Sequence, residues 1–168
     1  DGAFLTPRIE VMPAEGHTSG DLLALVAGAD VLFAGDLCFF GVTPLAFQGD
    51  PALWAEMLTT LPELASIIVP GHGPVCGIEG AMEMKAYFEY VSDESRWCFG
   101  QGLSALEAAK RIELGPYGEW RCPARLVANV ESAYREIRDE TANSSWDAAN
   151  TFDAIYKLAK ARGIEVEF

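Results

Sequence analysis

The segment Val-Pro-Gly-His-Gly-Pro at residues 69–74 places His72 in a glycine-rich turn directly after an apolar, strand-like run. The chain contains one other histidine, His17, and it lies in a turn of the same kind, Glu-Gly-His-Thr-Ser-Gly-Asp at residues 15–21. Glycine beside a functional side chain removes bulk and permits unusual backbone angles. A turn at a strand end also gives a rigid position from which a side chain projects. Both histidines are therefore candidate functional residues.

A carboxylate candidate lies between the two histidines, where Phe-Ala-Gly-Asp at residues 33–36 ends an apolar run in Asp36. Imidazole and carboxylate are suitable ligands for zinc, iron or manganese, and the two oxygens of a carboxylate allow it to bridge two ions. Taken alone, a histidine in a turn is usually solvated, and an aspartate after glycine usually caps a turn. Because all three residues follow strand-like runs in chain order, we interpret them together as a metal site.

These segments resemble motifs of the metallo-β-lactamase superfamily. Its patterns Gly-His-Thr-x-Gly, Phe-x-Gly-Asp and Gly-His-Gly occur here in order and at similar spacing, at residues 16–20, 33–36 and 71–73. Within the superfamily the resemblance is to glyoxalase II-like or cyclase-like metal-dependent hydrolases. It implies that His17 ligates the first of two metal ions, that His72 ligates the second, and that Asp36 bridges both.

The resemblance also implies a reaction. Two zinc ions, or iron or manganese in their place, would activate water for attack on a small-molecule carbonyl compound, namely an ester, thioester, lactone or lactam. Asp36 would be the catalytic residue that holds the metal pair together. Thr18 and Asp21 are candidates for orienting the imidazole N–H groups from outside the ligand shell, with local hydrogen bonding of the turn as an equal alternative.

One motif of the superfamily, His-x-His-x-Asp-His, has no counterpart here, because both histidines of the chain are already used. It would precede His17 and supply two ligands to each metal. The chain begins at Asp1 rather than Met, so we expect a fragment whose missing N-terminal half carries that motif. Catalytic zinc takes three protein ligands. We therefore expect this chain alone to bind metal weakly and to lack hydrolase activity.

Three interpretations of the chain stay open. It is a fragment of a hydrolase, a natural partial fold that acts as a binding module or as a subunit completed by another chain, or an unrelated globular domain. An upstream reading frame that encodes His-x-His-x-Asp-His would favour the fragment, and a genuine start codon at this point would exclude it. Absence of zinc, iron or manganese from the chain joined to its upstream segment would favour the unrelated domain.

The fold class follows from the same resemblance, because the superfamily has a four-layer αββα sandwich. We expect an α+β chain in which residues 1–77 form one αβ half of that sandwich and residues 78–168 form a helical extension packed on it. One sheet face of such a half, normally covered by the other half, would be exposed. A large exposed apolar patch favours association, so we expect a homo-oligomer or poor solubility.

Strand signals dominate the first 77 residues. The segment Phe4–Met12 is strand-like, and the apolar runs Leu22–Ala27 and Val31–Ala34 predict a β-hairpin with a short turn. An Asp-Pro pair at residues 50–51 predicts a helix to about Leu61, ended by Pro62. A buried strand, Ser66–Val69, closed by Pro70, would follow.

Helical signals dominate the rest of the chain. Apolar and aromatic residues recur at helical spacing after Ile78, Ser-Ala-Leu-Glu at residues 104–107 is a capping box, and Gly163 is a stop signal. Four helices are therefore expected, at residues 78–97, from 104 to about 115, at 123–141 and at 145–161. Residues 164–168 would either pair as a short strand or lie loose.

Charge and cysteine content restrict the partners and the compartment. The net charge is −13, and residues 1–77 contain nine acidic residues and one basic residue. Phosphate backbones and anionic lipids are bound by Lys and Arg, so we expect no nucleic-acid partner and no membrane partner. No apolar run approaches the roughly 20 residues that span a bilayer. The four cysteines form no Cys-x-x-Cys pair, which favours reduced, buried thiols and a cytoplasmic protein.

Overall fold

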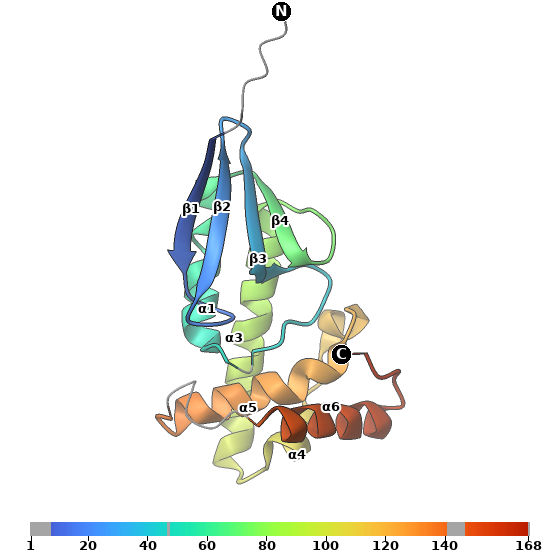
Figure 1. Ribbon diagram of the computed structural model, residues 1–168. Helices are drawn as coiled ribbons and strands as arrows, with labels where there is room; N and C mark the ends of the chain where they lie inside the picture. The colour runs from blue at the N-terminus through green and yellow to red at the C-terminus, as the bar shows by residue number, and fades with distance from the viewer. Residues whose placement is uncertain (1–7, 47, 141–146, 168) are drawn as a thin grey trace, which may run out of the picture.

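A four-stranded mixed β-sheet organises the N-terminal part of the chain, and helices make up most of the rest (Figure 1). The computed structural model describes residues 8–46, 48–140 and 147–167. The strands lie in the order β1-β2-β3-β4, with β1–β2 and β2–β3 antiparallel and β3–β4 parallel. Their bounds are Arg8–Ala14, Asp21–Ala27, Val31–Phe39 and Ile67–His72. The architecture is α+β, as the sequence indicates.

The predicted hairpin is confirmed as β2 and β3. Its turn has positive φ at Gly28 (83°) and Asp30 (57°), as a short connection of this kind requires. The hydroxyl and the backbone N–H of Ser66 donate hydrogen bonds to the Asp30 carboxylate, and these bonds lower the pKa of Asp30. The turn is thereby tied to the residue that precedes β4. The expected strand at Phe4–Met12 is β1 in part, and its first residues lie outside the described ranges.

The helix expected after the Asp-Pro pair is α1 (Pro51–Leu58). It begins as predicted, because the Asp50 carboxylate accepts hydrogen bonds from two backbone N–H groups of the first turn. The expectation that it runs to Leu61 is wrong. A separate short helix, α2 (Leu61–Leu64), begins there and holds Pro62 in its first turn. Proline is tolerated at that position because the first turn leaves its N–H groups unpaired in any case.

The strand expected at Ser66–Val69 does not close at Pro70. Instead β4 begins at Ile67 and continues through Pro70 to His72. Proline lacks the N–H that a central strand needs, but β4 lies at the edge of the sheet, where that donor is not required on the outer side. His72 is therefore the last residue of a strand rather than a residue of a free turn.

The four expected helices are present as α3, α4, α5 and α6. Helix α4 opens with the predicted capping box between Ser104 and Glu107. The third expected helix starts one turn late, because Pro123–Arg125 form a 3-10 turn, η2. A second 3-10 turn, η1, precedes it at Gly115–Glu119. The bounds of the four helices are Ile78–Gly100, Ala105–Arg111, Leu126–Ile137 and Ala148–Arg162.

Two expectations at the C-terminal end remain partly outside the described residues. The third helix ends at Ile137, before the expected Thr141, and the fourth begins at Ala148, after the expected Ser145. Thr141 and Ser145 themselves lie outside the described residues. Helix α6 ends at Gly163, which has φ of 65° and closes the helix in the left-handed conformation, as predicted. The described tail residues 164–167 form no strand.

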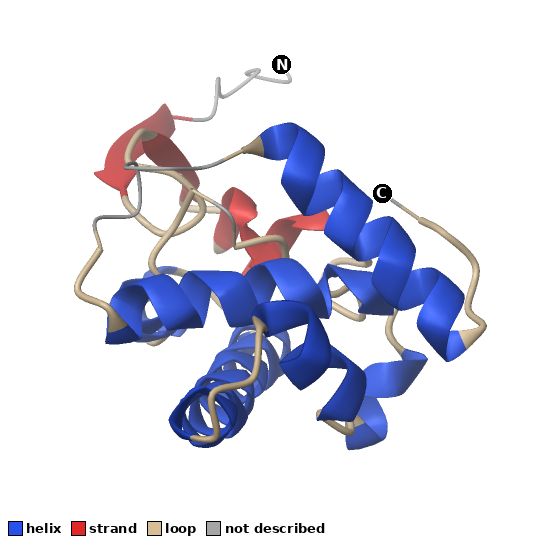
Figure 2. Ribbon diagram, turned by 90° about the horizontal axis from the view of Figure 1, so that it is seen from below, coloured by secondary structure: helices blue, strands red, loops and turns tan. Residues whose placement is uncertain are grey.

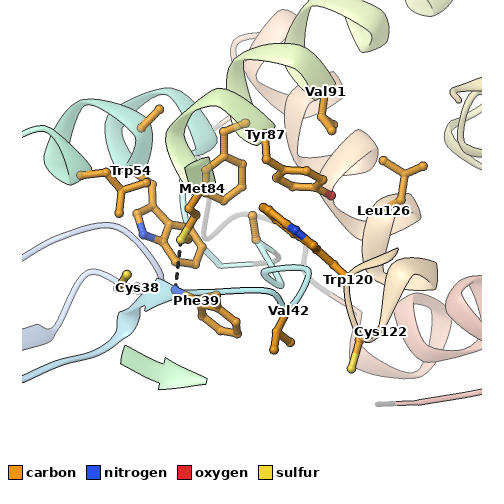
Figure 3. Close-up of a cluster of buried hydrophobic side chains, with 14 of the residues drawn as sticks. Cys38, Phe39, Val42, Trp54, Met84, Tyr87, Val91, Trp120, Cys122 and Leu126 are labelled. Atoms are coloured by element: carbon orange, nitrogen blue, oxygen red, sulfur yellow. Dashed lines mark hydrogen bonds between the residues drawn. The ribbon is translucent and has the colours of Figure 1, made fainter. Parts of the chain in front are cut away.

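One face of the sheet is covered by helices. Helices α1 and α3 lie behind the sheet in Figure 1, while α4, α5 and α6 gather beyond its lower end, as Figure 2 shows from below. The inner side chains of the strands and the helices form a single buried cluster, part of which is drawn in Figure 3. Its largest fully buried members are Trp54, Tyr87, Phe39, Phe88, Leu32, Leu37, Leu58, Leu61, Ile68, Met84, Ile112 and Leu126.

A buried amide joins the loop after β3 to the helices. The Asn129 side chain on α5 accepts from the backbone N–H of Ala46 (2.9 Å) and donates to the carbonyl of Pro44 (3.0 Å) and to the Tyr87 hydroxyl (2.7 Å). Both N–H donors and the carbonyl oxygen of the amide thus have partners inside the protein. These hydrogen bonds connect the loop after β3 to α3 and α5. The division of the chain into two parts at residue 77 stays a prediction.

The other face of the sheet is apolar and exposed. Val11, Ala24, Phe33 and Val69 are direct partners across the four strands, and no described element lies over them. Val11 is 61% exposed and Phe33 is 47% exposed. This exposed face is the one expected for half of a sandwich. Among the described residues, no helix combines the length and the apolar character needed to cross a membrane.

Candidate metal centre

The structure brings the three candidate ligands together at one end of the sheet. His17 lies in the loop between β1 and β2, Asp36 lies in β3, and His72 ends β4. The Nε2 atom of His17 is 4.0 Å from Oδ2 of Asp36, and Nε2 of His72 is 3.4 Å from Oδ1. Each imidazole therefore faces a different oxygen of the same carboxylate.

An irregularity in β3 positions the carboxylate. The pairing with β4 shifts between Phe33 and Gly35 and again between Gly35 and Phe39, and Gly35 has φ of 52°. An irregular strand of this kind re-aims side chains that a regular strand would alternate. Gly35 and Asp36 are exposed in succession, and the next three residues are buried in succession. The expected strand end at Asp36 is therefore a bend within a longer strand.

Two glycines of the Gly-His-Gly segment are required by close approach. A Cβ at Gly71 would lie 2.2 Å from Oδ1 of Asp36, so any larger residue would displace the carboxylate. At Gly73, φ is 94° and a Cβ would lie 1.9 Å from the carbonyl oxygen of Phe40. Gly71 thus leaves space for the Asp36 carboxylate, and Gly73 leaves space for the backbone of Phe40, directly after β3.

Two aromatic side chains that sequence reasoning did not select contact the histidines. The ring of Phe39 stacks on the imidazole of His72, with centroids 4.5 Å apart and planes at 16°. The indole of Trp54 on α1 meets the imidazole of His17 edge-on at 5.4 Å. Phe39 lies three residues after Asp36, but nothing in its spacing distinguishes it from an ordinary core residue. Trp54 comes from a helix that follows in the chain, so the sequence contains no signal for its contact.

No family model matches the chain. Hydroxyacylglutathione hydrolases of Shewanella baltica strains OS185 and OS195 are each 34% identical over 64 residues, which is 38% of this chain and 22% of the relative. The match thus spans about a fifth of the length of these curated relatives.

Solved structures resemble a larger share of the chain. A metallo-β-lactamase family protein from Thermus thermophilus matches with a TM-score of 0.58 at 21% identity, over 79% of this chain and 44% of that chain. The chain has the metallo-β-lactamase fold. A double mutant of the sec-alkyl sulfatase PisA1 matches with a TM-score of 0.57 at 14% identity, over 94% of this chain and 31% of that chain. Less than half of either solved chain is covered, which agrees with the expected partial fold.

Thr18 and Asp21 close the turn that carries His17 in this metallo-β-lactamase fold. The backbone N–H of Thr18 donates to Oδ2 of Asp21 (2.8 Å), and its hydroxyl donates to Oδ1 (2.7 Å). These hydrogen bonds lie within the turn, which is the alternative role of Thr18 and Asp21. Orientation of the His17 imidazole by either residue stays a prediction.

Zinc fits the donor chemistry of the three residues but not a complete site. Two imidazoles and a carboxylate are zinc ligands, and the glycine at position 71 leaves the space that the Asp36 carboxylate occupies. However, the described residues include no group of three or more His, Cys, Asp or Glu side chains close enough to hold one ion. Asp36 and His72 are nearly half exposed, at 47% and 44%, so the site is open on one side.

Proposed function

We propose that this chain carries part of the active site of a metal-dependent hydrolase. In this proposal His17 would hold one of two zinc ions, His72 would hold the other, and Asp36, the catalytic residue, would be shared between them. The observation that carries the proposal is the approach of two imidazole Nε2 atoms to different oxygens of one carboxylate. Zinc supplies Lewis-acid activation of water and of a carbonyl group, and iron or manganese suits the same donors.

The proposed substrate is a small molecule with an ester, thioester, lactone or lactam carbonyl. The Shewanella relatives are named hydroxyacylglutathione hydrolases, which favours an acyl compound within this class. The acidic character of residues 1–77 argues against nucleic acids, because one basic residue offers little to bind phosphates. The four cysteines are free and buried, which suits a cytoplasmic protein.

We further propose that a missing N-terminal half completes the site by supplying the His-x-His-x-Asp-His ligands. This chain alone would then bind metal weakly and would not hydrolyse substrate. The alternative is a non-catalytic binding module or a subunit completed by another chain. The exposed apolar sheet face around Phe33 fits either case, because it offers a surface that the missing half or a separate partner would cover.

Zinc titration followed by histidine NMR tests the proposal on this chain. We expect weak binding that perturbs the signals of His17 and His72 together. Asp36→Asn and His72→Ala should reduce the affinity at least tenfold, whereas Asp93→Asn, an exposed carboxylate on α3 paired with Arg96, should leave it unchanged. Equal affinity in all four proteins would contradict the ligand assignment.

Joining the chain to its upstream segment tests the hydrolase itself. We expect the joined protein to bind about two zinc ions tightly and to hydrolyse a model thioester. This chain alone should bind zinc only weakly and should not hydrolyse the thioester. A joined protein that contains His-x-His-x-Asp-His and still binds no zinc, iron or manganese would overturn the proposal.

A further inference from the structure

The imidazole of His72 is held by a ring contact. Phe39 stacks on it almost face to face, with ring centroids 4.5 Å apart and planes at 16°. The strand register explains the contact, since Phe39 and His72 are direct partners in the parallel β3–β4 pair. The backbone N–H of Phe40 also donates to the His72 carbonyl (3.0 Å). The two rings are therefore brought together by adjacent strands.

A hydrogen bond usually performs this task in metal sites. The ring nitrogen of a ligating histidine that does not bind metal commonly donates to a carboxylate or a carbonyl, and this bond sets the orientation of the ring. Within residues 8–46, 48–140 and 147–167, no hydrogen bond to Nδ1 of His72 is present. The stack with Phe39 is the described packing contact on the face of this half-exposed ring, beside the approach of its Nε2 to Asp36.

Phe39 is itself rigid enough to orient a neighbour. It is 2% exposed, its backbone N–H donates to Sδ of Met84 (3.2 Å), and its ring meets the indole of Trp54 edge-on at 6.1 Å (Figure 3). Trp54 is fully buried and donates from Nε1 to the carbonyl of Leu37 (2.9 Å). Burial and the contact with Trp54 restrict the Phe39 ring, because close-packed interiors leave few rotamers open.

We infer that Phe39 is a positioning residue for the proposed metal site, fixing the plane of the His72 imidazole so that Nε2 points at Oδ1 of Asp36. The stacked face restricts the plane of the imidazole, because a ring turned out of that plane would collide with the phenyl ring. The centroid of the same phenyl ring lies 6.3 Å from that of the His17 imidazole. The indole of Trp54 contacts the Phe39 ring and the His17 imidazole. Phe39 thus packs near the imidazoles of both histidines, and Trp54 packs against Phe39 and His17. This inference rests on the proposed function for its metal, but the orientation is measurable without metal.

The first test measures the metal-free protein by NMR. Protons above the face of an aromatic ring are shifted upfield, so the imidazole protons of His72 should be upfield of those in a denatured sample. Phe39→Leu should remove this shift, and Phe39→Tyr should retain it. Phe88→Leu is the matched control, because Phe88 is buried against Trp54 with a centroid distance of 5.0 Å and has no ring contact with His72. Absence of the shift in the unsubstituted protein, where no variant has to fold, would overturn the inference.

The second test measures cobalt or zinc affinity of the same proteins. We expect Phe39→Leu to weaken binding about tenfold, in the range seen when groups that orient metal ligands are removed. Phe39→Tyr and Phe88→Leu should bind as the unsubstituted chain does. Equal affinity in Phe39→Leu would reject the positioning role and leave the metal site standing. Absence of binding in the unsubstituted chain and in the chain joined to its upstream segment would reject the metal site, and the positioning role with it.

Discussion

The two faces of the β-sheet are similar in composition and opposite in environment. On the inner face, Leu25, Leu32 and Ile68 are direct partners across three strands, and the last two are fully buried beneath the helices. On the outer face, Val11 and Phe33 belong to an equally apolar row that is largely exposed. A soluble chain rarely leaves so continuous an apolar surface uncovered. The difference therefore indicates that the inner face stabilises this chain and that the outer face is adapted to a covering layer.

Neighbouring residues of β3 give the strongest test of this difference. Leu32→Ala should lower the free energy of unfolding by about 2–5 kcal/mol, because it removes buried methyl groups and leaves a cavity. Phe33→Ala removes a larger side chain but should cost less than about 1 kcal/mol, because 47% of Phe33 is already exposed. Urea denaturation at low protein concentration measures both. Equal losses of unfolding free energy in Leu32→Ala and Phe33→Ala would mean that the outer face is buried in the folded protein in solution.

Association of the chain tests the outer face directly. We expect oligomers at micromolar concentration, and the double variant Val11→Lys with Phe33→Lys should shift the chain toward monomer, because charges across the face oppose its burial. Leu53→Lys is a suitable control, since Leu53 is 55% exposed on α1, away from the sheet. Sedimentation velocity gives the masses. A monodisperse monomer of the unsubstituted chain would contradict the expectation.

The smallest expected effect concerns Asp30 in the turn between β2 and β3. Ser66 lowers the pKa of Asp30 from its ordinary value of 3.8 through two hydrogen bonds. A carboxylate with a lowered pKa in the folded state stabilises the fold above its unfolded pKa, and this contribution is lost as pH falls through the folded pKa. Asp30→Asn should therefore be slightly less stable at pH 7, and the difference should narrow below about pH 4. Thermal unfolding at pH 7 and pH 3 checks this, and a difference that does not depend on pH would contradict it.

Local features of the fold were predictable because their causes lie within a few residues. The hairpin of β2 and β3, the Asp50 cap of α1 and the capping box at Ser104 all depend on neighbours in the chain. The metallo-β-lactamase fold was predictable for a related reason, since three short motifs occur in the right order. The break after Leu58 was not, because a proline two residues into a new helix resembles a helix terminator in sequence.

The sequence alone determined which residues are candidates for the metal site, namely His17, Asp36 and His72, because no other histidines exist and each candidate follows a strand-like run. Only the tertiary structure decided how they meet. The bend in β3 turns Asp36 outward, the edge position of β4 lets that strand run on to His72, and Phe39 stacks on the imidazole. These outcomes depend on pairing between β3 and β4, whose partner residues are about 35 positions apart in the chain, and local sequence patterns carry no information about that pairing.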